Sequence, residues 1–171
     1  MQQRDKFISL LVKAVNNHAI YLWSAQGEKV IDLSEEEIKM KYETSEANAK
    51  RVINHINMLK QYNWLTSKTK AYDCSGLVCH CLSSCKRESE NFDLCADDLI
   101  KRYKKVDYPT AGCLVHRKGH IGVYIGYDNI IEAKGRDYGV IVSPFYRTEW
   151  EDFCDPFYRT EWEDFYDPFA A

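Results

Sequence analysis

The 171-residue sequence predicts an α+β domain in which N-terminal helices pack on an antiparallel β-meander. Apolar residues recur at helical spacing along the first 60 residues, and a short apolar helix follows. From Gly112 onward, β-branched runs alternate with glycine or Asp-Asn turns. The length suits one domain with an extension, and 45% hydrophobic against 29% charged residues is enough for a packed core.

The first half of the chain is predicted to be mainly helical and to form a structural scaffold. Residues 5–23 place apolar side chains at mostly helical spacing and predict a first helix. Ser34 with Glu37 forms a capping-box pattern, and Ser45 is the expected N-cap of a longer amphipathic helix. We interpret the charges between these two helices, His55 included, as a solvated face.

The second half contains two more helices and then strands. The sequence Asp-Cys-Ser-Gly at residues 73–76 is the expected first turn of a helix that runs to about Ser84, and a short helix follows over Ala96–Tyr103. Strands are predicted at 113–116, 120–126, 129–133 and 139–143.

Cys74 is the strongest candidate for a nucleophile. It lies at the expected start of a helix, where unpaired backbone N–H groups and the helix dipole favour the thiolate. The same N–H groups suit the oxyanion of an acyl-transfer intermediate. A cysteine with only a packing role would not require Gly76 two residues later.

His120 is the expected general base. It begins a strand whose small residues, Gly122 and Gly126, share its face together with Tyr124 and leave room for a substrate. The other histidines are less suitable, because they lie in the helical half, point away on the catalytic helix or flank the strand: His18, His55, His80 and His116.

Glu132 is the expected orienting group for the imidazole. A three-residue hairpin loop, Gly126–Asp128, would place Glu132 opposite Gly122 and diagonal to His120. A two-residue loop would place it on the other face. The alternative is an exposed strand acid paired with Lys134.

At these residues the chain resembles the NlpC/P60 family of papain-like cysteine peptidases. The resemblance lies in Asp73–Val78, in Gly119–Gly126 and in the polar Glu132 twelve positions after the histidine, with weaker similarity at 21–27 and 109–115. It implies a papain-like NlpC/P60 fold and hydrolysis of peptidoglycan stem peptides, at the γ-D-glutamyl–diamino acid bond. The catalytic set it implies is Cys74, His120 and Glu132, and the substrate-binding set is Tyr21, Asp73, Ser75 and Gly119.

The resemblance also guides the domain organisation. We expect one catalytic domain over residues 1–143, with a helical insertion at 27–70, and a C-terminal segment at 144–171. That segment is acidic and aromatic and repeats itself: PFYRTEWEDFCD at 144–155 is followed by PFYRTEWEDFYD. We interpret the repeat as a tandem duplication in which one copy closes the domain, with Trp150 or Trp162 on an apolar patch.

Several classes of function are disfavoured. A formal net charge of −3 gives no argument for nucleic-acid binding, and no apolar run is long enough to span a membrane. The cysteines lack paired zinc-knuckle spacing, so we expect no metal and no cofactor. The start of the sequence has no signal-peptide pattern. We therefore expect a protein that is cytoplasmic as synthesised and reaches its partner, the peptidoglycan peptide, after lysis or through a phage or secretion assembly.

Two alternatives remain from the residues alone. The same thiol–imidazole pair serves an amidase or acyltransferase. The second alternative is that the chain is a binding module with a vestigial site, such as a phage-tail or wall-docking protein.

Overall fold

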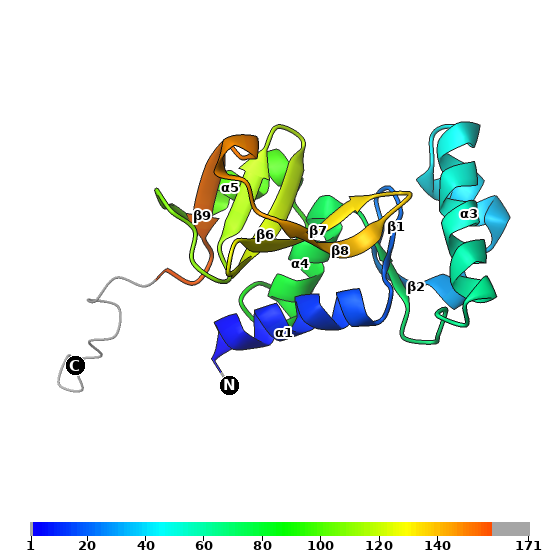
Figure 1. Cartoon of the computed structure of the whole chain (residues 1–171), viewed down its shortest axis with the longest axis horizontal. Helices are drawn as coiled ribbons and strands as arrows, with labels where there is room; N and C mark the ends of the chain where they lie inside the picture. Colours follow the sequence, from blue (N-terminus) through cyan, green and yellow to red (C-terminus); the bar gives the residue numbers. More distant parts are fainter. Residues whose placement is uncertain (1, 159–171) are drawn as a thin grey trace.

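The structure is a computed structural model that describes residues 2–158, in which helices pack on two sheets (Figure 1). The helices are α1 (Gln3–Asn16), α2 (Glu35–Glu37), α3 (Glu46–Gln61), α4 (Cys74–Ser84) and α5 (Ala96–Arg102), with short 3₁₀ or π segments at η1 (Val30–Asp32), η2 (Ile38–Tyr42) and η3 (Arg147–Glu149). The strands are β1 (Ile20–Tyr21), β2 (Gln26–Lys29), β3 (Lys70–Tyr72), β4 (Lys104–Lys105), β5 (Leu114–Arg117), β6 (His120–Gly126), β7 (Asn129–Gly135), β8 (Gly139–Pro144) and β9 (Asp152–Asp155). The predicted α+β class is confirmed.

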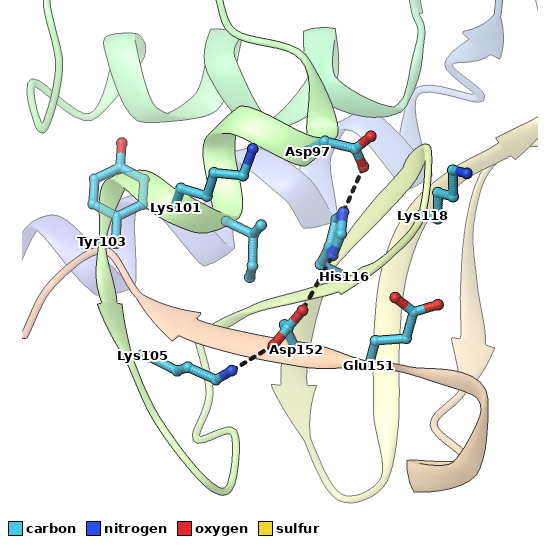
Figure 2. Close-up of a pocket in the computed structure, with 9 residues that line it drawn as sticks. Asp97, Lys101, Tyr103, Lys105, His116, Lys118, Glu151 and Asp152 are labelled. Carbon is cyan, nitrogen blue, oxygen red and sulfur yellow. Dashed lines mark hydrogen bonds and ion pairs between the residues drawn. The ribbon is translucent and has the colours of Figure 1, made fainter.

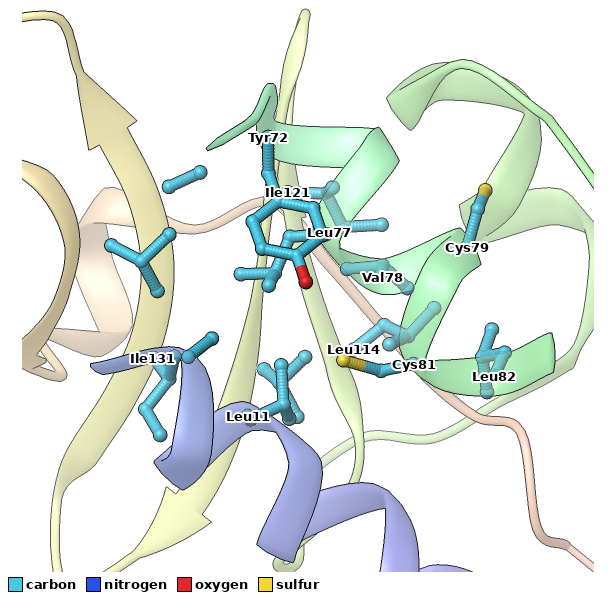
Figure 3. Close-up of a cluster of buried hydrophobic side chains, with 14 of the residues drawn as sticks. Leu11, Tyr72, Leu77, Val78, Cys79, Cys81, Leu82, Leu114, Ile121 and Ile131 are labelled. Carbon is cyan, nitrogen blue, oxygen red and sulfur yellow. The ribbon is translucent and has the colours of Figure 1, made fainter. Parts of the chain in front are cut away.

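A six-stranded antiparallel sheet carries the second half of the chain, in the order β4-β9-β5-β6-β7-β8. The four strands predicted from the alternating sequence form its meander, β5 to β8. Helices α1 and α4 cover one face and enclose the main core with Leu11, Leu77, Leu114 and Ile131 (Figure 3). Because α4 is enclosed by α1 and the sheet, it is apolar around most of its circumference, unlike the amphipathic α1.

A second core lies under the N-terminal scaffold. Between β2 and β3 the chain forms η1, α2, η2 and α3, and these elements pack on Ile20 and Leu22. The predicted capping box at Ser34 and Glu37 is present, and Ser45 caps α3. In Figure 1, α3 stands at the end of the molecule opposite β9.

The β6–β7 hairpin differs from its expected geometry but keeps its expected register. The loop has two residues, Tyr127 and Asp128, both with positive φ as a tight primed turn requires. A bulge at Ile125, between the pairs Tyr124–Ile130 and Gly126–Asn129, adds back the residue that the shorter loop removes. Glu132 therefore still faces Gly122, and the inference that a two-residue loop excludes this face was wrong.

The first copy of the C-terminal repeat is part of the domain. Its strand β9 lies between β4 and β5, and Trp150 just before it is 3% exposed. The domain therefore extends beyond the expected boundary at residue 143, because β9 completes the sheet. The second copy falls almost entirely outside the described residues, Trp162 included.

The seven cysteines are all free thiols. Cys79, Cys81 and Cys85 are buried on α4, whereas Cys95 is exposed at the start of α5. Among residues 2–158, every helix is too short or too polar to cross a bilayer.

Candidate active site

Cys74 is the first residue of α4, and its position is fixed by the residues around it. The carboxylate of Asp73 caps the helix, accepting from the backbone N–H of Gly76 at 2.6 Å. Its other oxygen accepts from the N–H of Ser24 at 3.0 Å, which ties the 22–25 loop to the helix start. A Cβ on Gly76 would lie 2.2 Å from the carbonyl oxygen of Ala25, so only glycine fits here.

The Cys74 thiol lies against the turn that precedes His120. Its Sγ is 3.9 Å from the carbonyl oxygen of Gly119, and α4 packs on β6. Burial, and then the negative charge of Asp73, raises the pKa of Cys74 to about 11. Backbone N–H groups at the helix start lower the pKa as expected, but they are outweighed. The helix start therefore favours the thiolate as expected, but its effect on the pKa of Cys74 is smaller than the combined effect of burial and Asp73.

His120 and Glu132 form a short, sheltered hydrogen bond. Nε2 of His120 lies 2.6 Å from Oε2 of Glu132, and their side chains are 17% and 5% exposed. Burial opposes ionisation of Glu132, but the hydrogen bond to His120 leads the effects that hold its pKa below the ordinary value. Because Nε2 is engaged, Nδ1 is the ring nitrogen left to accept a proton. The alternative of an exposed acid paired with Lys134 was wrong.

Trp150 covers this pair. Its indole stacks on the His120 ring with centroids 5.8 Å apart, and its Cη2 would lie 3.5 Å from a Cβ on Gly122. The glycine thus admits the tryptophan that shields the imidazole from water. The first repeat copy therefore contributes directly to the site.

Tyr21 reaches the same site from the N-terminal half. Strand β1 pairs in parallel with β3, which places Tyr21 beside Tyr72, two residues before Cys74. Burial raises the pKa of Tyr21 to about 12, and the charges of Cys74 and Asp73 add to this shift. Its hydroxyl can therefore donate a hydrogen bond, and Cys74 is near enough to contribute to the pKa shift. Strand pairing thus closes the gap of about 50 residues that the sequence leaves between them.

The remaining expected substrate residues use their polar groups within the protein. Ser75 Oγ donates to Asp73 at 3.3 Å. Gly119, with φ of +73°, forms the tight turn before β6 and donates its N–H to Asp97 Oδ1 at 2.8 Å. These residues shape the wall beside Cys74.

Sequence reasoning missed a buried ion pair behind Tyr21. The guanidinium of Arg136 lies over the Tyr21 ring, 5.2 Å from its centroid, and binds Glu43 through Nε at 2.9 Å and Nη2 at 2.8 Å. The Glu43 side chain is fully buried and also accepts from the N–H of Trp23. The interpretation of the charges here as a solvated face holds for most of them, such as Glu36 and Lys39, but was wrong for Glu43. His55 is half-buried, and its Nδ1 lies 3.1 Å from the Arg136 carbonyl oxygen. No sequence pattern distinguishes Glu43 from the exposed acids around it.

The other histidines lie outside this constellation. His80 on α4 lies 3.4 Å from Lys70, and His18 stacks on Trp64. His116 on β5 binds Asp97 at 2.7 Å.

Comparison with known proteins shows which protein family and which solved structures this chain is similar to. The model of the NlpC/P60 family matches residues 59–159, more than half of the chain. No curated protein matches. The fold is similar to the P60 domain of antigen MAP1204 from M. avium subspecies paratuberculosis, with TM-score 0.54 and 16% identity, covering 92% of this chain and all of that one. It is also similar to the Mycobacterium tuberculosis peptidoglycan hydrolase RipB (TM-score 0.55, 15% identity, 91% and 67% covered). RipD of the same organism, a non-catalytic NlpC/P60 domain protein adapted to peptidoglycan binding, has TM-score 0.53 and 17% identity over 90% and 95%.

Proposed function

The chain belongs to the NlpC/P60 family, and on that premise we propose that it is a cysteine peptidase that hydrolyses the stem peptides of bacterial peptidoglycan. The observation that carries the proposal is the 2.6 Å hydrogen bond between His120 and Glu132, together with the half-buried thiol of Cys74 against Gly119, the residue before His120. A nucleophile, a base and an orienting carboxylate are the three parts that thiol acyl transfer requires.

The reaction begins from a neutral thiol. As Sγ of Cys74 attacks the scissile carbonyl carbon, the S–H proton passes to Nδ1 of His120, and Glu132 stabilises the imidazolium. The oxyanion lies toward the backbone N–H groups at the start of α4 and the hydroxyl of Tyr21. Because burial raises the pKa of Cys74, the transfer of the S–H proton to His120 accompanies the attack.

The acyl-enzyme then forms and is hydrolysed, and His120 carries one proton in each of these two steps. The C–N bond breaks as His120 gives its proton to the departing amine, leaving a thioester on Cys74. Water attacks the thioester while His120 accepts a water proton, and that proton returns to the thiolate when the acid product leaves.

We propose the γ-D-glutamyl–diamino acid bond as the target. The support is the resemblance at residues 73–78 and 119–126, which includes the wall formed by Asp73, Ser75 and Gly119. Delivery to the wall through lysis or through a phage or secretion assembly stays a prediction from the sequence.

The test is digestion of purified peptidoglycan of the meso-diaminopimelate and L-lysine types, with the products identified by mass spectrometry. The proposal predicts fragments with a new free amino end on the diamino acid. Fragments cut elsewhere would disprove the proposed bond, and transfer of the acyl group to an added amine in preference to water would identify an acyltransferase.

Wall binding without hydrolysis is a second candidate, favoured by the similarity of fold to RipD. A binding module would sediment with peptidoglycan and release no fragments. It would also bind equally after Cys74→Ala.

A further inference from the structure

A second polar cluster lies on β5 and β9, in a pocket of about 610 Å³ (Figure 2). We propose that His116, Glu151 and Asp152 bind a divalent transition-metal cation of the Zn²⁺ class. One ligand atom from each of the three side chains lies within 4.8 Å of the others. The site is separate from the cysteines, whose spacing shows no metal-binding pattern, and from Cys74, His120 and Glu132.

His116 supplies the observation that points to a ligand. Its side chain is 8% exposed, and its Nδ1 is buried without a hydrogen-bond partner among residues 2–158. The closest carboxylate oxygen paired with Nδ1 is Oδ2 of Asp152, at 3.9 Å, too far for a hydrogen bond. A buried nitrogen lone pair facing a carboxylate across such a gap suits a bridging cation, and Figure 2 shows the ring between Asp97 and Asp152.

Asp97 fixes the ring in the form that metal binding needs. Its Oδ1 lies 2.7 Å from Nε2 of His116. A carboxylate on Nε2 places the ring proton there and leaves the Nδ1 lone pair free, as is usual for metal-bound histidines. Asp97 is itself held, because it also accepts from the N–H of Gly119.

The backbone holds the three ligands together. His116 and Asp152 are directly opposite in the β5–β9 ladder, and the N–H of Glu151 donates to the His116 carbonyl at 2.8 Å. Zinc ligands at about 2.0–2.2 Å from the ion lie roughly 3.3 Å from one another when tetrahedral. The side chains of Asp152 and the exposed Glu151 need to move by only about 1 Å to reach that spacing.

Nearby charges set the class and strength of binding. Lys105 holds Oδ1 of Asp152 at 2.7 Å, which leaves Oδ2 for the cation. Lys101 and Lys118 also line the pocket and weaken the attraction for any cation. One imidazole and two carboxylates favour Zn²⁺ or Co²⁺ over Ca²⁺ or Mg²⁺, which prefer oxygen ligands.

The test is calorimetric titration of the reduced full chain with ZnCl₂, together with the melting temperature with and without Zn²⁺. We expect one equivalent bound through this site and a melting temperature that rises with Zn²⁺, because the cation binds the folded state. Glu151→Gln should weaken binding at least tenfold and cancel most of the rise. Its side chain has no other polar contact within residues 2–158, so the variant should fold normally.

Glu149→Gln is the matched control, because Glu149 is an exposed acid two residues away and outside the cluster. It should bind Zn²⁺ as the wild type does. Equal Zn²⁺ binding by wild type and Glu151→Gln would overturn the proposal. A sulfur-to-metal charge-transfer band with Co²⁺ would also overturn it, because it would show that the metal is bound by the thiols. Absence of binding at millimolar Zn²⁺ would overturn it as well.

Discussion

His120 and Glu132 lie on neighbouring antiparallel strands with Nε2 and Oε2 2.6 Å apart, in a register set by a bulge at Ile125. The bulge keeps Glu132 opposite Gly122 and diagonal to His120, and the two side chains span this diagonal with a direct hydrogen bond. The carboxylate is 5% exposed, so water competes poorly for it. The hydrogen bond fixes the His120 ring, and the first two predictions depend on it.

Glu132→Gln should lower kcat by roughly 10²–10⁴-fold, because an amide cannot stabilise the imidazolium and can bind the wrong tautomer. Rates of stem-peptide release measure the effect. Lys134→Gln is the control, because it removes the lysine on β7 that the alternative interpretation paired with Glu132. A comparable loss in Lys134→Gln would mean that the carboxylate acts through Lys134.

His120→Ala should abolish turnover, whereas His116→Ala should only weaken it. His120 directly follows Gly119, whose carbonyl contacts the Cys74 thiol, while His116 acts at a distance through Asp97, which holds the N–H of Gly119. Assays of both variants at equal folded concentration give the ranking. If His116→Ala were the inactive variant, the assignment of the base would be wrong.

Alkylation of Cys74 by iodoacetamide should accelerate about tenfold per pH unit from pH 7 to about pH 10. The pKa of Cys74 is raised to about 11, so the thiolate fraction keeps growing throughout this range. Peptide mapping by mass spectrometry follows the site, in a Cys95→Ser background that removes the exposed thiol. A plateau below pH 8 would indicate a resting thiolate.

Arg136→Met should reduce the free energy of unfolding by about 3–5 kcal/mol, because it leaves the fully buried charge of Glu43 unpaired. Urea denaturation provides the measurement. Arg51→Met is the matched control, since Arg51 joins α3 to Asp137 of the β7–β8 turn through an exposed pair. The urea midpoint of Arg51→Met should stay near that of the wild type. Equal losses of unfolding free energy in the two variants would show that burial of the ion pair is not the deciding factor.

The sequence predicts most of the local structure and the hydrogen-bonded neighbours His120 and Glu132 of the candidate site. Periodicity locates α1 and α3 because each buries one face, whereas α4 is located by its Asp-Cys-Ser-Gly start and the meander by its β-branched runs between turns. The caps at Ser34, Ser45 and Asp73 are equally local signals. Glu132 was placed correctly although the loop length was wrong, because the bulge compensates for it.

What the sequence could not predict depends on contacts between distant residues. Strand β9 pairs with both β4 and β5, and a short strand inside a repeat gives no sign of its partners. Glu43 and Arg136 are 93 positions apart and look like ordinary surface charges. The raised pKa of Cys74 follows from burial and from Asp73, and these outweigh the helix-start effect that the sequence does reveal.

The most direct test of the central claim is the rate at which new amino ends appear when peptidoglycan is incubated with wild type, Cys74→Ala and Cys95→Ser. Cys95 is the exposed thiol outside the site, so its variant controls for general thiol effects. We predict that Cys95→Ser retains the wild-type rate and that Cys74→Ala releases nothing above the blank. Release by Cys74→Ala at the wild-type rate would contradict thiol catalysis by this protein.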